Sequence, residues 1–151
     1  MALKVGFVFP GQGSQSVGMG KALYDAHSSL KSVYDEASTV LGYDVAELCF
    51  TGPAERLNLT EFTQPALLVS SVAAWKLFEP VGIKPVAVAG HSLGEYSAMV
   101  AAGGVSFRDA VGLVQKRGRY MSEAVAPGTG LVAALLGLNA EVVKEVCRMA
   151  S

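Results

Sequence analysis

The sequence predicts an α/β fold built on a parallel sheet. Three short apolar runs, 4–9, 85–89 and 131–138, predict strands because they are rich in β-branched and aliphatic residues and meet glycine or proline. The stretches between them carry helical spacing, and strands that alternate with helices indicate a parallel sheet. An open sheet usually has about 4–6 strands, so three strands predict an incomplete one.

The region between the first two strands is predicted to be mostly helical. The first strand stops at Pro10-Gly11, and residues 11–15 are a loop. Ser28 or Ser29 can cap a helix that runs to about Leu41, with Gly42 at its end. Asp44 can cap a short helix over 45–49.

Further helices follow along the chain. Gln64-Pro65 predicts the start of a helix to about residue 79, with Pro65 at the first position, where its missing N–H costs least. Another helix is expected over 93–102. Ser106 and Asp109 resemble a capping box for a helix to about Ala126. Residues 127–130, Pro-Gly-Thr-Gly, predict a boundary, and Asn139 caps a last helix that starts at Ala140.

The composition excludes several functional classes. The chain has 151 residues, 51% of them hydrophobic, which excludes a disordered chain. A net charge of -1 argues against nucleic acid as a partner, and the lack of a long apolar run argues against a membrane span. The apolar residues 5–9 are too short for a signal peptide. Two cysteines form no disulfide framework, so we expect a reducing compartment, the cytoplasm.

A nucleophile is predicted at Ser92. The stretch Gly90-His-Ser-Leu-Gly94 is a G-x-S-x-G pattern between an expected strand and an expected helix. In that context the serine sits on a sharp turn with its Oγ exposed, and the glycines avoid collisions in the turn. The amide of Leu93 then points from the helix N-terminus towards an oxyanion formed at Ser92. The alternative is an ordinary strand-to-helix turn with Ser92 as its N-cap.

The sequence supplies no obvious base for this serine. It contains 2 histidines. His91 directly precedes Ser92, so its side chain is expected to point away from the turn as a hydrogen-bonded support. His27 is expected at a helix end, as a surface residue or a cap. Because a serine hydroxyl needs an adjacent base at neutral pH, the chain predicts a nucleophile without its base.

A second glycine cluster follows the first strand, in Phe9-Pro-Gly-Gln-Gly-Ser-Gln15. Gln12 and Gln15 offer amide donors, and ligands collect at the carboxyl ends of parallel strands. If the first two strands are neighbours, Gln12 and the Leu93 amide share one site. The cluster lacks the G-x-G-x-x-G and Walker patterns, which argues against a dinucleotide or phosphate site. The alternative is a plain strand-to-helix turn.

One arginine lies on an apolar helix face. Arg117 follows Val114 by three residues and precedes Met121 by four, so it shares their inward face. A guanidinium there is costly unless it is paired. It can grip a substrate carboxylate, or it can form a structural ion pair with an internal residue such as Glu95. Spacing alone leaves both possibilities open.

Four motifs come in a fixed order along the chain. They are residues 8–15 (Val-Phe-Pro-Gly-Gln-Gly-Ser-Gln), 63–67 (Thr-Gln-Pro-Ala-Leu), 90–97 (Gly-His-Ser-Leu-Gly-Glu-Tyr-Ser) and 116–118 (Lys-Arg-Gly). The set resembles the malonyl-CoA:acyl carrier protein transacylases of bacterial-type fatty acid synthesis. The acyltransferase domains of polyketide synthases share most of it. The resemblance covers essentially the whole chain.

The resemblance implies a covalent transfer. Ser92 would take malonyl from coenzyme A as an ester and pass it to the phosphopantetheine thiol of acyl carrier protein. The Gln12 side chain and the Leu93 amide would flank the oxyanion. The substrate-binding residues would be Arg117, which would pair with the free malonyl carboxylate, Gln64 and His91. No cofactor or metal is implied, because the coenzyme A thioester is a substrate.

The resemblance also implies an architecture. Residues 1–127 would be the N-terminal part of an α/β-hydrolase-like domain, and 128–151 the first strand and helix of an inserted ferredoxin-like domain. Family members have roughly twice this length, and their catalytic histidine has no counterpart here. We therefore expect the N-terminal half of such an enzyme, inactive without its C-terminal half. Alternatives are a polyketide-synthase-type acyltransferase, a serine hydrolase, and a non-catalytic domain that binds carrier protein.

Overall fold

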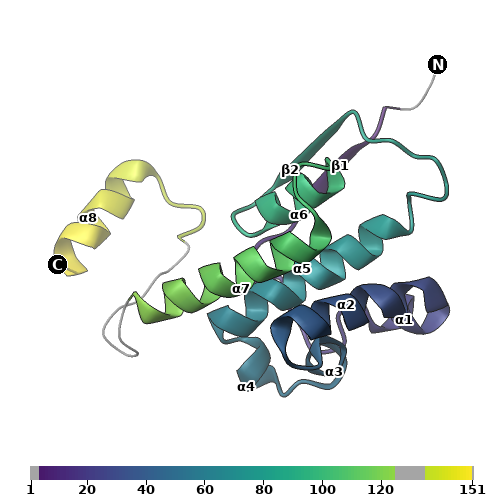
Figure 1. Cartoon of the computed structure of the whole chain (residues 1–151). Helices are drawn as coiled ribbons and strands as arrows, with labels where there is room; N and C mark the ends of the chain where they lie inside the picture. Colours follow the sequence, from purple (N-terminus) through teal and green to yellow (C-terminus); the bar gives the residue numbers. More distant parts are fainter. Residues whose placement is uncertain (1–3, 125–134, 151) are drawn as a thin grey trace.

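The computed structural model describes residues 4–124 and 135–150, and its elements are labelled in Figure 1. The sheet within these residues has two strands, β1 (Gly6–Phe9) and β2 (Ala87–Gly90). They pair in parallel and in direct register along their whole length. Both strands and a parallel sheet were expected from the sequence, and the structure confirms them; whether these two strands are neighbours was left open, and they are.

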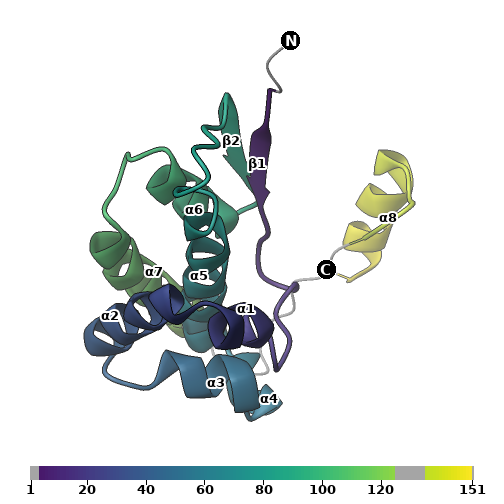
Figure 2. The same cartoon turned by 90° about the vertical axis from the view of Figure 1, so that its right-hand side faces the viewer.

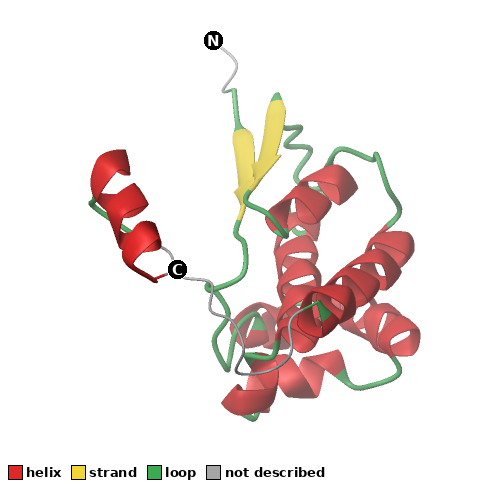
Figure 3. Cartoon of the chain, turned by 90° about the vertical axis from the view of Figure 1, so that its left-hand side faces the viewer, coloured by secondary structure: helices red, strands yellow, loops and turns green. Residues whose placement is uncertain are grey.

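Helices make up most of the described chain. Figures 2 and 3 show α1–α7 gathered on one side of the two strands, with α8 standing apart. The helices are α1 (Lys21–Ala26), α2 (Lys31–Leu41), α3 (Val45–Thr51), α4 (Ala54–Leu57), α5 (Thr60–Lys76), α6 (Gly94–Ala101), α7 (Phe107–Glu123) and α8 (Ala140–Ala150), with a 3₁₀ turn at Ser28–Leu30. The described part is therefore a small parallel sheet with a helical layer, a partial α/β domain.

Helix α5 runs through the middle of the core. Every side chain from Thr63 to Val69 is buried. A helix that is buried on all sides must be covered by other elements, and α2, α6 and α7 all pack against α5. The buried face of α7 consists of Ala110, Val111, Val114 and Gly118. This contact between α5 and α7 brings Arg117 on α7 next to Gln64 on α5.

The start of α5 differs from the prediction. The helix begins at Thr60, so Pro65 lies inside it rather than at its first position. A proline there removes one backbone donor, the N–H that would bond to the Glu61 carbonyl. Pro65 is buried among other core residues, and this tertiary burial outweighs its local preference for a helix start. The prediction that Gln64-Pro65 opens the helix is therefore wrong.

Three predicted N-caps are confirmed. The side chains of Asp44, Ser106 and Asn139 each accept a hydrogen bond from the backbone N–H three residues later, at 2.9, 3.1 and 3.0 Å. Gly42 ends α2 with a φ of 78°, as expected for a C-terminal glycine. The predicted cap at Ser28 or Ser29 is wrong, because a 3₁₀ turn precedes α2 and no side chain caps it.

Only part of what was predicted for the region after α7 lies within the described residues. α7 ends at Glu123, short of the expected residue 126. The predicted boundary 127–130 and residues 131–134 of the third strand lie outside the described residues. Residues 135–138 are described and form no strand, because no described strand lies beside them to complete a ladder. None of the described helices combines the length and the apolar composition that crossing a bilayer requires.

Candidate active site

Ser92 stands at a sharp turn between β2 and α6. Its φ of 53° is the one positive φ of a non-glycine residue within the described chain. The side chain is exposed at the surface of the turn. The next residue, Leu93, already has helical dihedral angles. The G-x-S-x-G pattern predicted such a turn, and the backbone has this form.

The two glycines of the pattern allow the turn to close. A Cβ on Gly90 would collide with the backbone of Gly94 and Glu95. A Cβ on Gly94 would collide with the carbonyl groups of Phe9 and Pro10. The turn therefore packs backbone against backbone, both within itself and against the end of β1.

Backbone contacts join this turn to the loop that follows β1. The His91 N–H donates to the Phe9 carbonyl at 3.1 Å, and the His91 carbonyl accepts from the Gly94 N–H at 2.9 Å. A Cβ on Gly11 would lie 2.7 Å from His91 Nδ1, so the imidazole lies against this loop. The two glycine clusters of the sequence thus meet at one edge of the sheet, as expected for the case in which the two strands are neighbours.

The Leu93 amide lies at the start of α6. The Leu93 side chain is buried, and the Leu93 N–H donates to no acceptor within residues 4–124 and 135–150. An N–H at the N-terminus of a helix carries part of the positive end of the helix dipole. It can therefore donate to negative charge that develops next to Ser92.

Arg117 reaches the serine from α7. Its Nη2 donates to Ser92 Oγ at 3.0 Å, and its Nη1 donates to Gln64 Oε1 at 2.6 Å. The guanidinium carbon also lies 5.7 Å from the centre of the Tyr96 ring. Within the described residues Arg117 has no carboxylate partner, so the suggested structural ion pair with Glu95 is not formed. The guanidinium is half-buried beside the nucleophile and carries an uncompensated charge there.

Gln64 holds this guanidinium from the core side. The residue is 0% exposed. Its Oε1 accepts from Arg117, while its Nε2 donates to the sulfur of Met121 at 3.2 Å. A buried amide must satisfy both ends, and here both partners come from one helix, α7. The orientation of the Gln64 amide is thereby fixed with its oxygen towards Arg117.

The loop that follows β1, residues 11–15, is called the glutamine loop here, and its side chains bond to residues around the start of α5. Gln12 Nε2 donates to Thr60 Oγ1 at 3.0 Å, and Gln15 Nε2 donates to Asn58 Oδ1 at 2.9 Å. Sequence reasoning missed Thr60, Asn58 and also Tyr96. The signal for the first two is that two polar side chains flank Leu59, just before the motif that begins at Thr63.

No histidine serves Ser92 within the described residues. His27 lies at the end of α1, and the His91 imidazole makes no hydrogen bond to the Ser92 hydroxyl. No cluster of three His, Cys, Asp or Glu side chains that suits a metal ion occurs in the described ranges. Cys49 is a buried thiol that forms no disulfide within the described residues.

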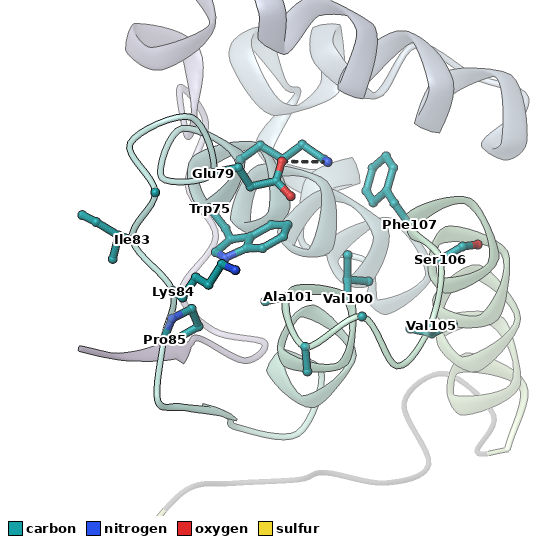
Figure 4. A pocket seen from close by; sticks show the side chains of 14 residues that line it. Trp75, Glu79, Ile83, Lys84, Pro85, Val100, Ala101, Val105, Ser106 and Phe107 are labelled. Atoms are coloured by element: carbon teal, nitrogen blue, oxygen red, sulfur yellow. Dashed lines mark hydrogen bonds and ion pairs between the residues drawn. The ribbon is translucent and has the colours of Figure 1, made fainter. Parts of the chain in front are cut away.

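A hollow of about 610 Å³ lies near the opposite end of α6 (Figure 4). Trp75 from α5 and Phe107 from α7 flank it, and a Lys76–Glu79 ion pair of 3.1 Å lies at its wall. Neither Ser92 nor Arg117 lines this hollow. This hollow and the β2–α6 turn are therefore separate places in the described chain.

The comparison with protein families gives a match along nearly the whole chain. The model of the acyl transferase domain matches residues 6–149. This chain belongs to the acyl transferase domain family. The malonyl CoA-acyl carrier protein transacylase of Bacillus subtilis strain 168 is 53% identical over 143 residues, which cover 95% of this chain and 45% of that protein. The transacylase of Escherichia coli K12 is 50% identical over 146 residues, covering 96% and 47%.

Solved structures of transacylases share the fold of this acyl transferase chain. The malonyl CoA-acyl carrier protein transacylase of Coxiella burnetii superposes with a TM-score of 0.90 and 47% identity, covering 97% of this chain and 47% of that one. A malonyl-transacylase solved in complex with a type II polyketide synthase acyl carrier protein gives the same TM-score and identity, covering 97% and 48%. The chain spans about half the length of the relatives it matches.

Proposed function

We propose that the protein containing this chain transfers malonyl from coenzyme A to acyl carrier protein, through an ester on Ser92. The observation that carries the proposal is the hydrogen bond between Arg117 Nη2 and Ser92 Oγ. It places an uncompensated cation beside the nucleophile. An acyl group that carries its own carboxylate would find a charge-assisted partner there. The names of the relatives and the transacylase–carrier complex support the same substrates.

The transfer takes two balanced steps. Ser92 Oγ attacks the thioester carbonyl carbon, the C–S bond breaks, and coenzyme A leaves as a thiol with the proton that Ser92 gave up. The thiol of the carrier then attacks the ester carbon, the C–O bond breaks, and the proton returns to Ser92. A covalent intermediate of this kind divides one difficult transfer into two easier ones.

Each step passes through an oxyanion. We assign its stabilisation to the Leu93 N–H and to the Gln12 side chain. The Leu93 N–H is unpaired within the described residues, and the loop that carries Gln12 packs against the turn. A single donor of this kind contributes about 10²–10³ to kcat in a serine enzyme. His91 is proposed to support the pocket, since its imidazole lies against the same loop.

The base for Ser92 is proposed to come from outside these 151 residues. We further propose that residues 1–127 form part of an α/β-hydrolase-like domain and that 128–151 begin a ferredoxin-like one. The separate position of α8 in Figures 1 and 2 supports this division. On this account the activity belongs to the whole protein, and this chain alone does not turn over substrate.

The proposal predicts that Arg117→Ala changes the choice of acyl group. In the whole protein the variant should lower kcat/KM for malonyl-CoA by at least about 10-fold, because a charged hydrogen bond contributes roughly 1.5–3 kcal/mol. Transfer from acetyl-CoA, which has no carboxylate, should be unchanged or faster. Transfer to holo acyl carrier protein from each thioester measures the ratio.

Arg119→Ala is the matched control. Arg119 lies on the same helix, is exposed, and pairs with Glu123 at 3.7 Å. Its removal should leave the malonyl-to-acetyl ratio as in the unmodified protein. An Arg117→Ala variant with the same ratio would contradict the carboxylate role.

A further inference from the structure

Neutral groups hold the Arg117 guanidinium within the described residues. Nη1 donates to the Gln64 side-chain oxygen at 2.6 Å, and Nη2 donates to the Ser92 hydroxyl at 3.0 Å. The guanidinium carbon lies over the Tyr96 ring, 5.7 Å from its centre. None of these three partners carries a formal charge, and no ion pair of the described residues includes Arg117. The cation is therefore fixed in place while its charge stays uncompensated.

The two hydrogen bonds of Arg117 differ once Ser92 carries an acyl group. Ser92 Oγ is then an ester oxygen, so Nη2 can turn to the carboxylate of the acyl group, which is a stronger acceptor because it is charged. Nη1 can keep its bond to Gln64 throughout. The Gln64 residue is 0% exposed, and its Nε2 donates to Met121 Sδ at 3.2 Å, so both ends of this amide are fixed.

The amide at position 64 differs in one respect from the carboxylate that could replace it. A glutamate there would also accept from Arg117, through a charge-assisted bond. It would, however, cancel the positive charge that a substrate carboxylate needs. The oxygen of a glutamine side chain accepts the same hydrogen bond and adds no charge.

We propose that Gln64 is a positioning residue that sets the choice of acyl group. It anchors Arg117 through a neutral oxygen and so keeps the guanidinium charge for the substrate. This inference rests on the proposed function, in which Arg117 pairs with the malonyl carboxylate. Gln64 acts through Arg117 and needs no contact of its own with the acyl group.

A purely structural role for Gln64 predicts a different result. Gln64 is buried where α5 packs against α7. If it only filled that space, a replacement would loosen the core and slow the transfer of every acyl group by the same factor. A positioning role instead changes the malonyl-to-acetyl ratio of kcat/KM, and does so only while Arg117 is present.

The test measures this ratio in the whole protein, with malonyl-CoA or acetyl-CoA as donor and holo acyl carrier protein as acceptor. Gln64→Glu keeps an acceptor for Arg117 and cancels its charge. It should lower the ratio by about 10-fold or more, as for the loss of a charged hydrogen bond. Gln64→Leu removes the anchor and should lower the ratio by about 3-fold, as for the loss of a weaker bond. In an Arg117→Ala background neither replacement should change the ratio.

Gln115→Glu is the matched control on α7. Gln115 lies two positions before Arg117, and its Nε2 donates to the Leu41 carbonyl at 3.0 Å. The same exchange of amide for carboxylate there should leave the malonyl-to-acetyl ratio unchanged. Thermal unfolding of each variant shows whether it is folded, and Gln64→Leu carries the test if Gln64→Glu does not fold.

The contrary outcomes separate the inference from the proposed function. An unaltered ratio in the folded Gln64 variants, or the same fall in the Arg117→Ala background, would overturn the positioning role of Gln64. The carboxylate role of Arg117 would still stand if Arg117→Ala alone lowered the ratio. An unaltered ratio in Arg117→Ala would contradict that carboxylate role, and the inference would fail with it.

Discussion

Ser92 occupies a backbone conformation that other parts of the chain must hold in place. A non-glycine residue in the left-handed region costs about 1–3 kcal/mol and persists where its surroundings impose it. Here those surroundings are the close backbone contacts made possible by Gly90 and Gly94. This conformation exposes Ser92 Oγ and leaves it 3.0 Å from Arg117 Nη2. The same contacts therefore set both the conformation of Ser92 and its access to substrate.

Cys49 provides a residue-scale test of the buried core. Burial raises the pKa of its thiol from an ordinary 9.0 to about 12. Burial likewise raises the pKa of the Tyr34 hydroxyl to about 12. Both groups stay neutral in the folded state while the unfolded chain begins to ionise. Their contribution to stability is complete below pH 9 and is lost as the pH rises towards 12.

We therefore expect the free energy of unfolding to fall above pH 9. Each proton that only the unfolded state releases lowers it by about 1.4 kcal/mol per pH unit. Denaturant titrations between pH 8 and pH 11 measure the slope. Cys49→Ala removes one titrating group and should show a shallower decline. Identical slopes for the two proteins would contradict the burial of this thiol.

At the residue scale, the sequence predicted those features that depend on residues close to one another in the chain. The sharp turn at Ser92 follows from glycines two residues on either side. Helical spacing correctly placed Arg117 beside the buried Val114, but Met121, expected on the same inward face, is 50% exposed. The partners of Arg117 could not be read in this way. Gln64 lies 53 positions earlier in the chain and reaches Arg117 only because two helices pack. Spacing left open whether Arg117 binds a substrate carboxylate or an internal residue such as Glu95, and it gave no sign of Gln64.

The contact between α5 and α7 is the feature that assembles the site at the scale of elements. Gly118 lies where a Cβ would press on the backbone of Thr60 and Glu61. Gly118→Ala should push the helices apart and destabilise the fold by about 1–3 kcal/mol. It should also weaken the preference for malonyl-CoA, because Arg117 and Gln64 would separate. Thermal unfolding together with the malonyl-to-acetyl ratio measures both effects.

Gly112→Ala is the control on the same helix. A Cβ there would lie 3.9 Å from Val40 Cγ1, an ordinary contact. Alanine favours a helix over glycine by about 1 kcal/mol, so this variant should be as stable as the unmodified protein or more stable. If both variants behaved alike, close packing at Gly118 would not be what brings Arg117 to Gln64.

Local signals predicted some elements and failed for others. Caps such as Asp44 were correct because they depend on bonds within three residues. The start of α5 was wrong because burial of Pro65 among core side chains is a tertiary effect. Residues 135–138 were expected to be part of a strand, yet a strand exists only with a neighbour to pair with, and the described residues provide none there.

At the scale of the whole molecule, the described chain carries only part of an active site. It presents an exposed serine, a cation beside that serine and a free amide at a helix start. Its two strands are fewer than an open parallel sheet usually has. It spans about half the length of the transacylases it matches. We therefore propose that the reaction belongs to the whole protein and that this chain forms the acyl-enzyme bond.

The most direct measurement is the mass of the whole protein after brief exposure to malonyl-CoA, followed by peptide mapping. We expect one malonyl group, on the peptide that contains Ser92, and none in Ser92→Ala. Addition of holo acyl carrier protein should move the group to the carrier faster than water removes it, which distinguishes a transferase from a hydrolase. Transfer without an adduct, or an adduct on another residue, would contradict a malonyl ester on Ser92.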